Sequence, residues 1–288
     1  MKNIVVRLFM GIISIITTAG STMGQKALNI FTFNIRFDNP GDAPNDWPNR
    51  KGLAASQILF HNADIVGVQE AQYHQLTDLK ERLPGYDFVG VGRDDGKKAG
   101  EHSSIFFNTN RLELQASSTF WLSLTPEVPG SKSWDAAITR VVTWAKFRDR
   151  NTRKIFFVFN THFDHIGKIA RQESAKMILR TVDSIRGKSP CIVTGDFNSF
   201  PEDDPIKILV DKTNPISLSD TKPLSQTGHY GPEGTFTGFG PKEANNNPID
   251  YIFIKGNWVV EKHATLSQTW GGRFSSDHFP VMARLILK

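Results

Sequence analysis

Short apolar runs that end abruptly in polar residues constrain the fold of this chain more than any other feature of its sequence. Runs rich in Val, Ile and Phe and bounded by turn residues are typical of buried β-strands. Here such runs end in an amide, a carboxylate or an imidazole at 31–34, 66–70, 157–162 and 192–198, and further polar groups follow at 249–251 and 276–278. Because strand ends on adjacent sheets can converge on one edge, these residues are candidates for a shared site.

Segments with apolar residues at helical spacing are fewer than the strands. They predict helices over 50–62, 72–83, 168–185 and 204–212. Numerous strands and few helices in a mixed order favour packed sheets with helices outside over a simple doubly wound parallel sheet. No internal repeat or low-complexity tract divides the chain, so residues 25–288 are predicted to form a single domain.

The first 24 residues have the order of a secretory signal peptide. Lys2 and Arg7 precede an apolar run over 8–16, and small residues follow up to Gly24. We expect cleavage near Gly24–Gln25, a periplasmic or secreted protein, and no stable membrane insertion afterwards. An uncleaved anchor is the alternative, although the run is short for a bilayer span.

The composition is typical of a globular domain and argues against a strongly basic DNA-binding protein. A hydrophobic share of 39% and a charged share of 22% are those of a globular domain. The formal net charge of +5 falls to +3 once Lys2 and Arg7 are removed with the signal peptide, which is only mildly basic. Duplex DNA is therefore not the expected substrate. The lone Cys191 cannot form an internal disulfide; it lies in an apolar run and is predicted to be a small core residue. The chain is expected to act as a monomer.

The strand-end residues suit phosphate chemistry with a divalent cation. Glu70 and Asp277 offer hard oxygen ligands for Mg²⁺ or Mn²⁺. Asn34 and Asn198 can hold a phosphate oxygen or a water without adding charge. Histidines such as His162 and His278 can donate protons to phosphoryl oxygens. Each residue alone has an ordinary explanation, since a single Asn is usually a turn residue and a single Glu a solvated charge; the order of all of them carries the interpretation.

That order resembles the endonuclease/exonuclease/phosphatase superfamily, which has the DNase I-like fold. The motifs that carry the resemblance are Gly195-Asp196-Phe197-Asn198, Ser276-Asp277-His278-Phe279-Pro280, Val68-Gln69-Glu70 and Asn160-Thr161-His162. The resemblance runs from about Leu28 to Leu287 and implies an α/β (α+β) fold, a four-layer α/β/β/α sandwich with two central mixed β-sheets.

The resemblance also implies roles on the metal side of the site. Glu70 would be the principal metal ligand, Asp277 would lie near the same ion, and Asn34 would lie beside both the metal and the phosphate. The expected cofactor is Mg²⁺, with Mn²⁺ as a substitute.

On the catalytic side, the resemblance implies that Asp196 orients and deprotonates the attacking water and that Asn198 holds the water or a phosphate oxygen. His278 would stabilise the developing charge with Asp250 as its orienting partner. His162 would be a second imidazole beside the phosphate, and is the alternative to Asp196 as the base.

A finer resemblance, over 47–57, 133–140 and 161–165, is to a bacterial branch nearest the nocturnin-like enzymes. It suggests that Arg140 binds the substrate phosphate through its planar fork. Trp134 could stack on a base or a sugar, or could simply pack in the interior.

The predicted function is a metal-dependent phosphoesterase that hydrolyses a phosphodiester or a phosphomonoester by water attack at phosphorus. The substrate would be a small molecule, a nucleotide or a single-stranded nucleic acid. The alternatives are a catalytically inactive binding scaffold with the same fold and a nonspecific secreted nuclease, and the fold alone does not choose between them.

Overall fold

The computed structural model describes residues 27–240 and 247–288, and it contains two β-sheets that face each other. The strands of the first sheet are β1 (Leu28–Asn34), β2 (Ile65–Gln69), β3 (Tyr86–Val89), β4 (Ile105–Asn108), β10 (His229–Tyr230), β12 (Trp258–Thr265) and β13 (Val281–Leu287). Their spatial order is β10-β12-β13-β1-β2-β4-β3, with β1 parallel to β2 and antiparallel to β13. The predicted signal peptide, residues 1–24, lies outside the described residues.

The second sheet is also mixed. Its strands are β5 (Leu112–Trp121), β6 (Val141–Asp149), β7 (Ile155–His162), β8 (Cys191–Asp196), β9 (Ser219–Asp220) and β11 (Asp250–Lys255). Their order is β5-β6-β7-β8-β11-β9, with β7 parallel to β8 and β11 antiparallel to β8.

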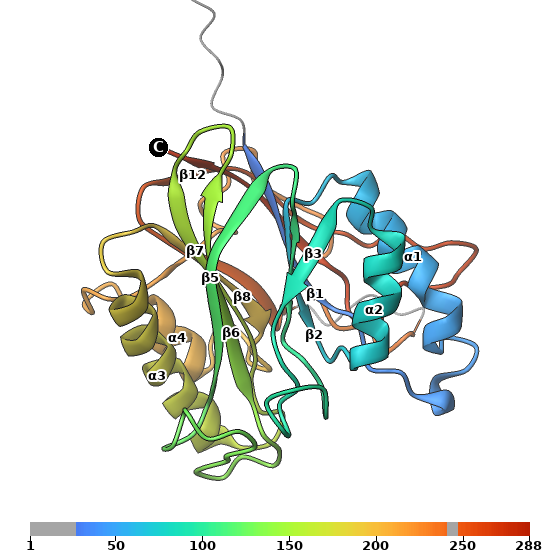
Figure 1. The fold of residues 1–288 in the computed structure, drawn as a ribbon, viewed down its shortest axis with the longest axis horizontal. Coiled ribbons are helices and arrows are strands. Elements are labelled where there is room, and N and C mark those ends of the chain that lie inside the picture. The colour runs from blue at the N-terminus through green and yellow to red at the C-terminus, as the bar shows by residue number, and fades with distance from the viewer. Residues whose placement is uncertain (1–26, 241–246) are drawn as a thin grey trace, which may run out of the picture.

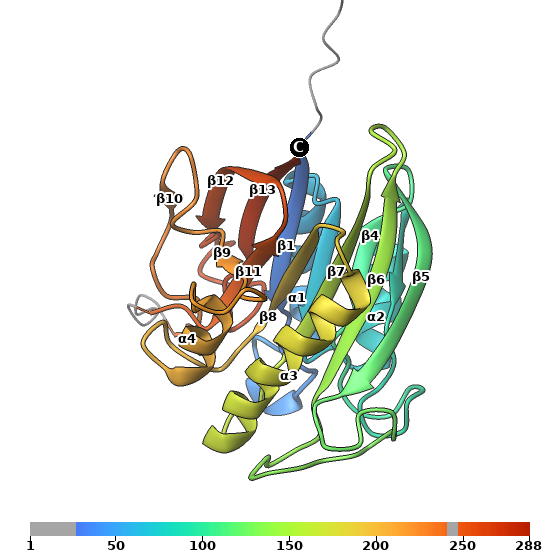
Figure 2. The ribbon, with the colours of Figure 1, turned by 90° about the vertical axis from the view of Figure 1, so that its left-hand side faces the viewer.

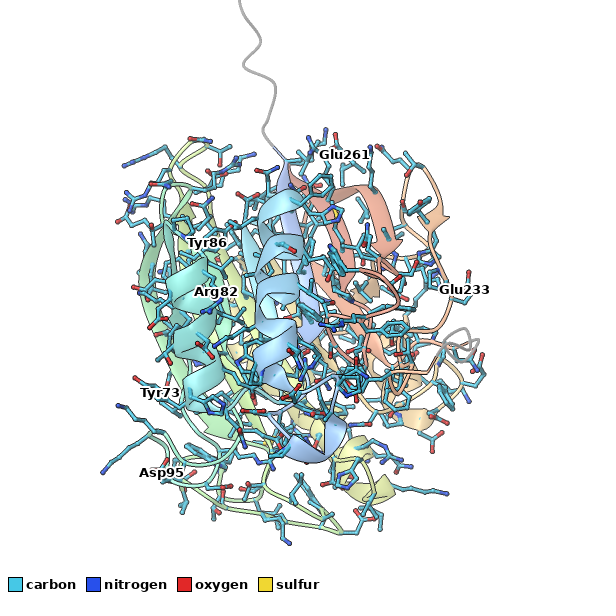
Figure 3. The ribbon with its side chains drawn as sticks, turned by 90° about the vertical axis from the view of Figure 1, so that its right-hand side faces the viewer. Tyr73, Arg82, Tyr86, Asp95, Glu233 and Glu261 are labelled. Atoms are coloured by element: carbon cyan, nitrogen blue, oxygen red, sulfur yellow. The ribbon has the colours of Figure 1, made fainter. Side chains whose placement is uncertain are left out.

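Helices cover the two outer faces. They are α1 (Trp47–Phe60), α2 (Tyr73–Arg82), α3 (Lys168–Arg186) and α4 (Asp204–Val210), and a short 3₁₀ turn, η1 (Pro40–Asp42), precedes α1. Figure 1 shows α1 and α2 outside the first sheet and α3 and α4 outside the second. Figure 2 shows α3 and α4 from their own side. In Figure 3, α1 and α2 lie side by side, with Tyr73 and Arg82 marking α2. The expected four-layer α/β/β/α sandwich is confirmed.

Two local differences from the sequence-based prediction have physical causes. Helix α1 begins at Trp47 rather than residue 50, because Pro48 occupies its first turn, where a missing N–H costs nothing. Strand β12 was not predicted: charged residues interrupt its apolar pattern, and its pairing with β13 shifts register between Val260 and Lys262. The lone Cys191 is buried, as predicted, and burial raises the pKa of its thiol to about 12.

The layer between the sheets changes character along its length. On β1 the residues that face the second sheet are Leu28, Ile30, Thr32 and Asn34, in that order along the strand. The first two belong to an apolar cluster with Ile192, Val158 and Phe156 of the second sheet. Thr32 and Asn34 are equally buried but hydrogen-bonded to polar side chains. The inter-sheet layer therefore has an apolar half and a polar half.

The border between the halves is a buried hydrogen-bonded cluster around Asn160 of β7. Its side-chain oxygen accepts hydrogen bonds from Gln69 Nε2 (2.7 Å) and Thr194 Oγ1 (3.0 Å), and its Nδ2 donates to the Val68 and Ser104 carbonyls. Gly67 lies directly opposite: a Cβ there would be 2.2 Å from Thr194 Oγ1 and 2.5 Å from Asn160 Oδ1. Only a glycine permits this close approach of the two sheets.

Helix packing completes the fold on the outer faces. Alternate residues of β1 and β2, such as Phe33 and Val68, face α1 and α2, where Trp47 is fully buried. On the other side Phe159 and Val193 face α3, whose buried stripe includes Ile178 and Val182. Within the described ranges 27–240 and 247–288, none of the helices combines the length and the apolar character that a membrane span requires.

Candidate active site

The strand ends of both sheets meet at one end of the sandwich. Parallel pairing places Asn34 of β1 beside Gln69 of β2, so that Glu70 follows directly, and places His162 of β7 beside Asp196 of β8. Antiparallel pairing brings Asp250, the first residue of β11, next to Asp196. This register explains how residues far apart in the chain form one polar cluster.

Asn34 connects the two sheets within this cluster. Its Nδ2 donates to Glu70 Oε1 and to Asp196 Oδ2, each at 2.9 Å, and lies 3.4 Å from His278 Nε2. Its side-chain oxygen accepts a hydrogen bond from the backbone N–H of Arg36 (3.0 Å). Asn34 is fully buried, so its orientation is fixed, and it holds the two carboxylates of the site in place.

His278 and Asp250 form a buried imidazole–carboxylate pair. His278 Nδ1 is 2.9 Å from Asp250 Oδ2, and its Nε2 is 3.8 Å from Asp196 Oδ2. Burial alone would lower the pKa of His278, but the charge of Asp250 and its hydrogen bond raise that pKa well above the ordinary value. His278 is therefore a cation at neutral pH, with Nε2 directed toward the centre of the site.

Asp196 is a deeply buried carboxylate with a raised pKa. It is almost inaccessible to solvent, and its Oδ1 accepts a hydrogen bond from the backbone N–H of Asn198 (2.9 Å). Burial, reinforced by the negative charge of Asp250, raises the pKa of Asp196 to about 7. A pKa close to the working pH is the most effective one for removing a proton from water.

His162 differs from His278 in its charge state. Burial, together with the positive charges of Arg140 and Arg93, lowers the pKa of His162 well below its ordinary value. Its Nε2 accepts from Asn198 Nδ2 at 3.0 Å and lies 3.5 Å from Asp196 Oδ2. Asn198 Nδ2 also donates to the Phe163 carbonyl, and its backbone has a positive φ of 45°. His162 is thus a neutral imidazole beside Asp196.

Glu70 and its neighbours offer the donor set of a divalent cation site. Glu70 has a positive φ of 63°, which turns its side chain from the end of β2 into the cluster. Ligand atoms of Glu70, His162 and Asp196 lie within 4.8 Å of one another, and so do those of Asp196, Asp250 and His278. Asp277 is buried nearby, and burial together with the charge of Glu70 raises its pKa. Carboxylate oxygens dominate this set, which fits Mg²⁺ or Mn²⁺.

The two residues suggested for substrate binding have different surroundings. Arg140 is buried, its Nη2 is 3.2 Å from His165 Nδ1 and its Nε is 3.8 Å from Asp164 Oδ2. Its Nε and Nη1 lack a hydrogen-bond partner, and it lines a small cavity together with Glu70 and His162. Trp134 is half-buried in the loop between β5 and β6, with a positive φ of 56°. Stacking by Trp134 stays a prediction.

Sequence reasoning missed three residues that the structure places at or beside the cluster. Arg36 directly follows the Asn34–Ile35 strand end and lies within 4 Å of both Glu70 and Asp277. Arg50 of α1 is buried and holds the loop after β1 through the Ile35 and Arg36 carbonyls. Phe236 lies with its ring 5.0 Å from that of His278. Arg36 could have been found from its place two residues after Asn34; the other two have no signal in the sequence.

The profile of the Endonuclease/Exonuclease/phosphatase family matches residues 31–278. A solved endonuclease/exonuclease/phosphatase from Bacteroides vulgatus is 40% identical, with a TM-score of 0.87, and the match covers 91% of this chain and 100% of that one. A mannosyl-6-phosphatase from Bacteroides thetaiotaomicron is 39% identical, with a TM-score of 0.86, covering 90% and 100%.

A more distant structure shares the fold. The catalytic domain of human nocturnin is 21% identical, with a TM-score of 0.71, and the match covers 91% of this chain and 95% of that domain. The sandwich and the order of its elements therefore extend well beyond the bacterial relatives.

Proposed function

Because the chain belongs to the Endonuclease/Exonuclease/phosphatase family, whose members hydrolyse phosphoester bonds, we propose that it is a divalent-cation-dependent phosphoesterase. The observation that carries this proposal is the buried group of Asp196, His278 and Asp250 joined to Glu70 through Asn34. This group combines a base with a pKa near 7, a fixed cation and an oxygen-rich cation site within hydrogen-bonding distances.

The residues divide the chemistry between them. Asp196 takes a proton from the attacking water, and Asn198 helps to hold that water. The charged His278 donates to a phosphoryl oxygen and stabilises the negative charge that develops there, while Asp250 keeps it protonated and oriented. The buried, unpartnered donors of Arg140 bind another phosphoryl oxygen.

Glu70 would hold the divalent ion, with Asp277 as a further oxygen ligand. When bound, the ion supplies Lewis-acid stabilisation of the charge on the phosphate and the leaving oxygen. Asn34 serves this site by fixing Glu70 Oε1 through its Nδ2. Asn34 Oδ1, engaged by the Arg36 backbone, positions the loop after β1.

For the substrate, we propose a small phosphorylated sugar. The similarity to a mannosyl-6-phosphatase supports this choice. A pocket of about 180 Å³ beside Asn198 supports it as well, because the half-exposed rings of Phe200 and Phe236 and the polar side chains of Asp203 and Asn247 line it. Aromatic rings suit the apolar C–H face of a sugar, and a carboxylate and an amide suit its hydroxyl groups.

The test is a screen of the purified protein with Mg²⁺, Mn²⁺ or EDTA. Its substrates are hexose phosphates, nucleotides, inositol phosphates, phospholipids, RNA, and single-stranded and duplex DNA. We expect hydrolysis of a hexose phosphate to be fastest, to stop in EDTA and to return with either metal. Full activity in excess EDTA would refute the metal requirement. No turnover of any phosphoester would support the inactive scaffold, and fastest cleavage of nucleic acid would support the nuclease.

We also propose export, with removal of residues 1–24 and a monomeric mature domain over 25–288. The charged, apolar and small residues at the start of the chain support this proposal. N-terminal sequencing of protein recovered outside the cytoplasm should begin near residue 25, and light scattering should give a monomer mass. A recovered chain that starts at Met1 would contradict the cleavage.

A further inference from the structure

Two neighbouring pockets beside the active site share one lining residue, Asp203. The first, of about 180 Å³, begins at Asn198 and is the pocket described above for the sugar. The second, of about 230 Å³, lies where α3 and α4 begin, and these helices are neighbours in Figure 2. Ligand sites commonly enclose about 300–1,000 Å³. Neither pocket alone reaches that size, but the two together do.

Asn198 connects the first pocket to the active site. Its Nδ2 donates to His162 Nε2 (3.0 Å), and its backbone N–H donates to Asp196 Oδ1 (2.9 Å). The next residue, Ser199, also lines this pocket, and its buried hydroxyl has no hydrogen-bond partner among the described residues. A substrate with its phosphate at Asp196 would therefore have its sugar ring in the first pocket and could extend past Asp203 into the second.

Asp203 presents a carboxylate oxygen at the junction of the two pockets. Its Oδ2 accepts a hydrogen bond from the backbone N–H of Phe200 (2.8 Å), and its carbonyl accepts one from the N–H of Lys207 (3.1 Å) in α4. These bonds fix the residue and leave Oδ1 without a hydrogen-bond partner in the ranges 27–240 and 247–288. Because Asp203 is exposed to solvent, Oδ1 is available to a hydroxyl group of a ligand that passes from one pocket to the other.

The second pocket is already formed without a ligand. Gln172 Nε2 donates to Asp204 Oδ2 (2.8 Å), which joins α3 to α4. Arg171 Nη1 donates to the Asp164 carbonyl (2.9 Å), so its guanidinium is held at the start of α3. A pocket whose side chains are held in this way loses little conformational freedom when a ligand binds.

The charges of the second pocket indicate which class of ligand it accepts. Its polar side chains are those of Lys168, Arg171, Gln172, Glu202, Asp203 and Asp204. Two cations and three carboxylates leave one negative charge, which disfavours the further phosphates of a polynucleotide. An apolar chain would remove water from these charges without replacing its hydrogen bonds. A neutral sugar, by contrast, offers hydroxyl groups that can both donate and accept.

We propose that the second pocket binds a neutral sugar joined to the phosphorylated one, so that the preferred substrate is a phosphorylated oligosaccharide rather than a free hexose phosphate. The inference rests on the proposed function, because it assumes that a sugar phosphate is hydrolysed. The second pocket lies away from the reacting atoms and determines specificity. Binding of a remote part of the substrate should raise kcat/KM.

The test compares kcat/KM of the full chain, with Mg²⁺, on matched sugar phosphates. They are a hexose 6-phosphate, its methyl glycoside, and a dihexoside with the same 6-phosphate on its first sugar. The dihexoside should exceed the methyl glycoside by about tenfold, the factor that one or two added hydrogen bonds supply. A dihexoside whose second sugar is a uronic acid should lose this gain, because the pocket has a negative charge. An equal gain with the uronic acid would overturn the assignment of a neutral sugar.

Lys168→Ala/Glu202→Ala tests the second pocket directly. Both side chains are exposed, and their joint removal leaves the net charge of the chain unchanged. The ratio of kcat/KM for the dihexoside to that for the methyl glycoside should fall most of the way to one. Glu202→Ala alone, in the loop before α4, is the second variant if the double variant does not fold, and it should lower the same ratio.

Glu173→Ala/Lys176→Ala is the matched control. It removes an ion pair of α3 (2.8 Å) that does not line either pocket, and the ratio should stay at its wild-type value. A wild-type ratio of one, or an unchanged ratio in folded Lys168→Ala/Glu202→Ala or Glu202→Ala, would overturn the inference and leave the proposed function standing. If wild type hydrolysed none of the sugar phosphates, the proposed function itself would fail.

Discussion

The two halves of the inter-sheet layer are formed by the same strands, but the buried side chains are apolar in one half and polar in the other. On β1, Ile30 and Asn34 face the second sheet from the same side of one strand and are both fully buried. Ile30 belongs to an apolar cluster that joins the sheets. Asn34 instead hydrogen-bonds to the carboxylates of Glu70 and Asp196. Burial is equal in the two halves, and only the nature of the contacts differs.

This difference shows how a sandwich can keep charged groups inside itself. The apolar half supplies the free energy that holds the sheets together, since burial of apolar surface is the main driving force of folding. The polar half contributes less, because buried carboxylates are costly even when they are paired. Stability should therefore depend on the apolar half and turnover on the polar half.

The largest effect is expected from the charged residues of the polar half. Asp196→Asn removes the proposed base and His278→Ala removes the proposed cation, and each should lower kcat by about 10²–10⁴-fold, the usual contribution of such groups. Circular dichroism should show a native fold, because both residues lie at the end of the sandwich. A near wild-type rate for Asp196→Asn would mean that another group, such as His162, is the base.

Ile30→Ala should have the opposite result. Removing a fully buried side chain from the apolar cluster should lower the free energy of unfolding by about 2–5 kcal/mol, measured by urea denaturation. At a temperature where the variant is folded, kcat should stay within about twofold of wild type. Ile30→Val is the control and should cost only about 0.5–1.5 kcal/mol. A large loss of kcat in folded Ile30→Ala would show that the halves are not separate.

Asn160→Ala tests the border between the halves. It removes one hydrogen bond each from Gln69, Thr194 and the Val68 and Ser104 carbonyl groups, so unfolding should become easier by about 1–3 kcal/mol. Turnover should fall by less than in Asp196→Asn, because Asn160 positions the strands and does not reach the site itself. Thr194→Val, which removes a single donor, should lie between this variant and wild type in stability. If Asn160→Ala were as stable as wild type, the hydrogen bonds of Asn160 would not stabilise the border between the two halves.

The smallest expected effect is a shift of the pH profile. Asp196 must be ionised to act as a base, so kcat should rise with pH through its pKa of about 7. His278 must be protonated, so kcat should fall as pH rises through its raised pKa. Asp250→Asn removes the charge that raises this pKa, so the alkaline limb should move to lower pH by about one unit or more. An unmoved alkaline limb would show that it reports another group.

Much of the fold and the grouping of the site could be predicted from the sequence. Apolar runs and the polar groups at strand ends indicated packed sheets with helices outside and a common edge, and the family resemblance implied the four-layer sandwich. The residues that escaped prediction act through tertiary contacts. Arg36 owes its place to a left-handed backbone in the loop after β1. Arg50 lies in a helix, and helical periodicity does not indicate which carbonyl groups its side chain contacts. Phe236 pairs with His278 in an isolated β-bridge, outside the named strands.

Strand β12 shows the same limit for the fold. Its apolar pattern is broken by Glu261 and Lys262, so local sequence gives a weak signal. Pairing with β13 on one side and β10 on the other makes it a strand. Neighbouring strands supply partners that a pattern along the chain does not contain.

Gly67 affects the site as well as the packing of the sheets. Glu70 follows a strand of the first sheet and Asp196 ends a strand of the second, so the distance between the sheets also determines the distance between these two carboxylates. Gly67 permits a close approach of the sheets there, against Thr194 and Asn160. A methyl group at this position, as in Gly67→Ala, would meet Thr194 and Asn160 and force the two sheets apart, which would move Glu70 away from Asp196.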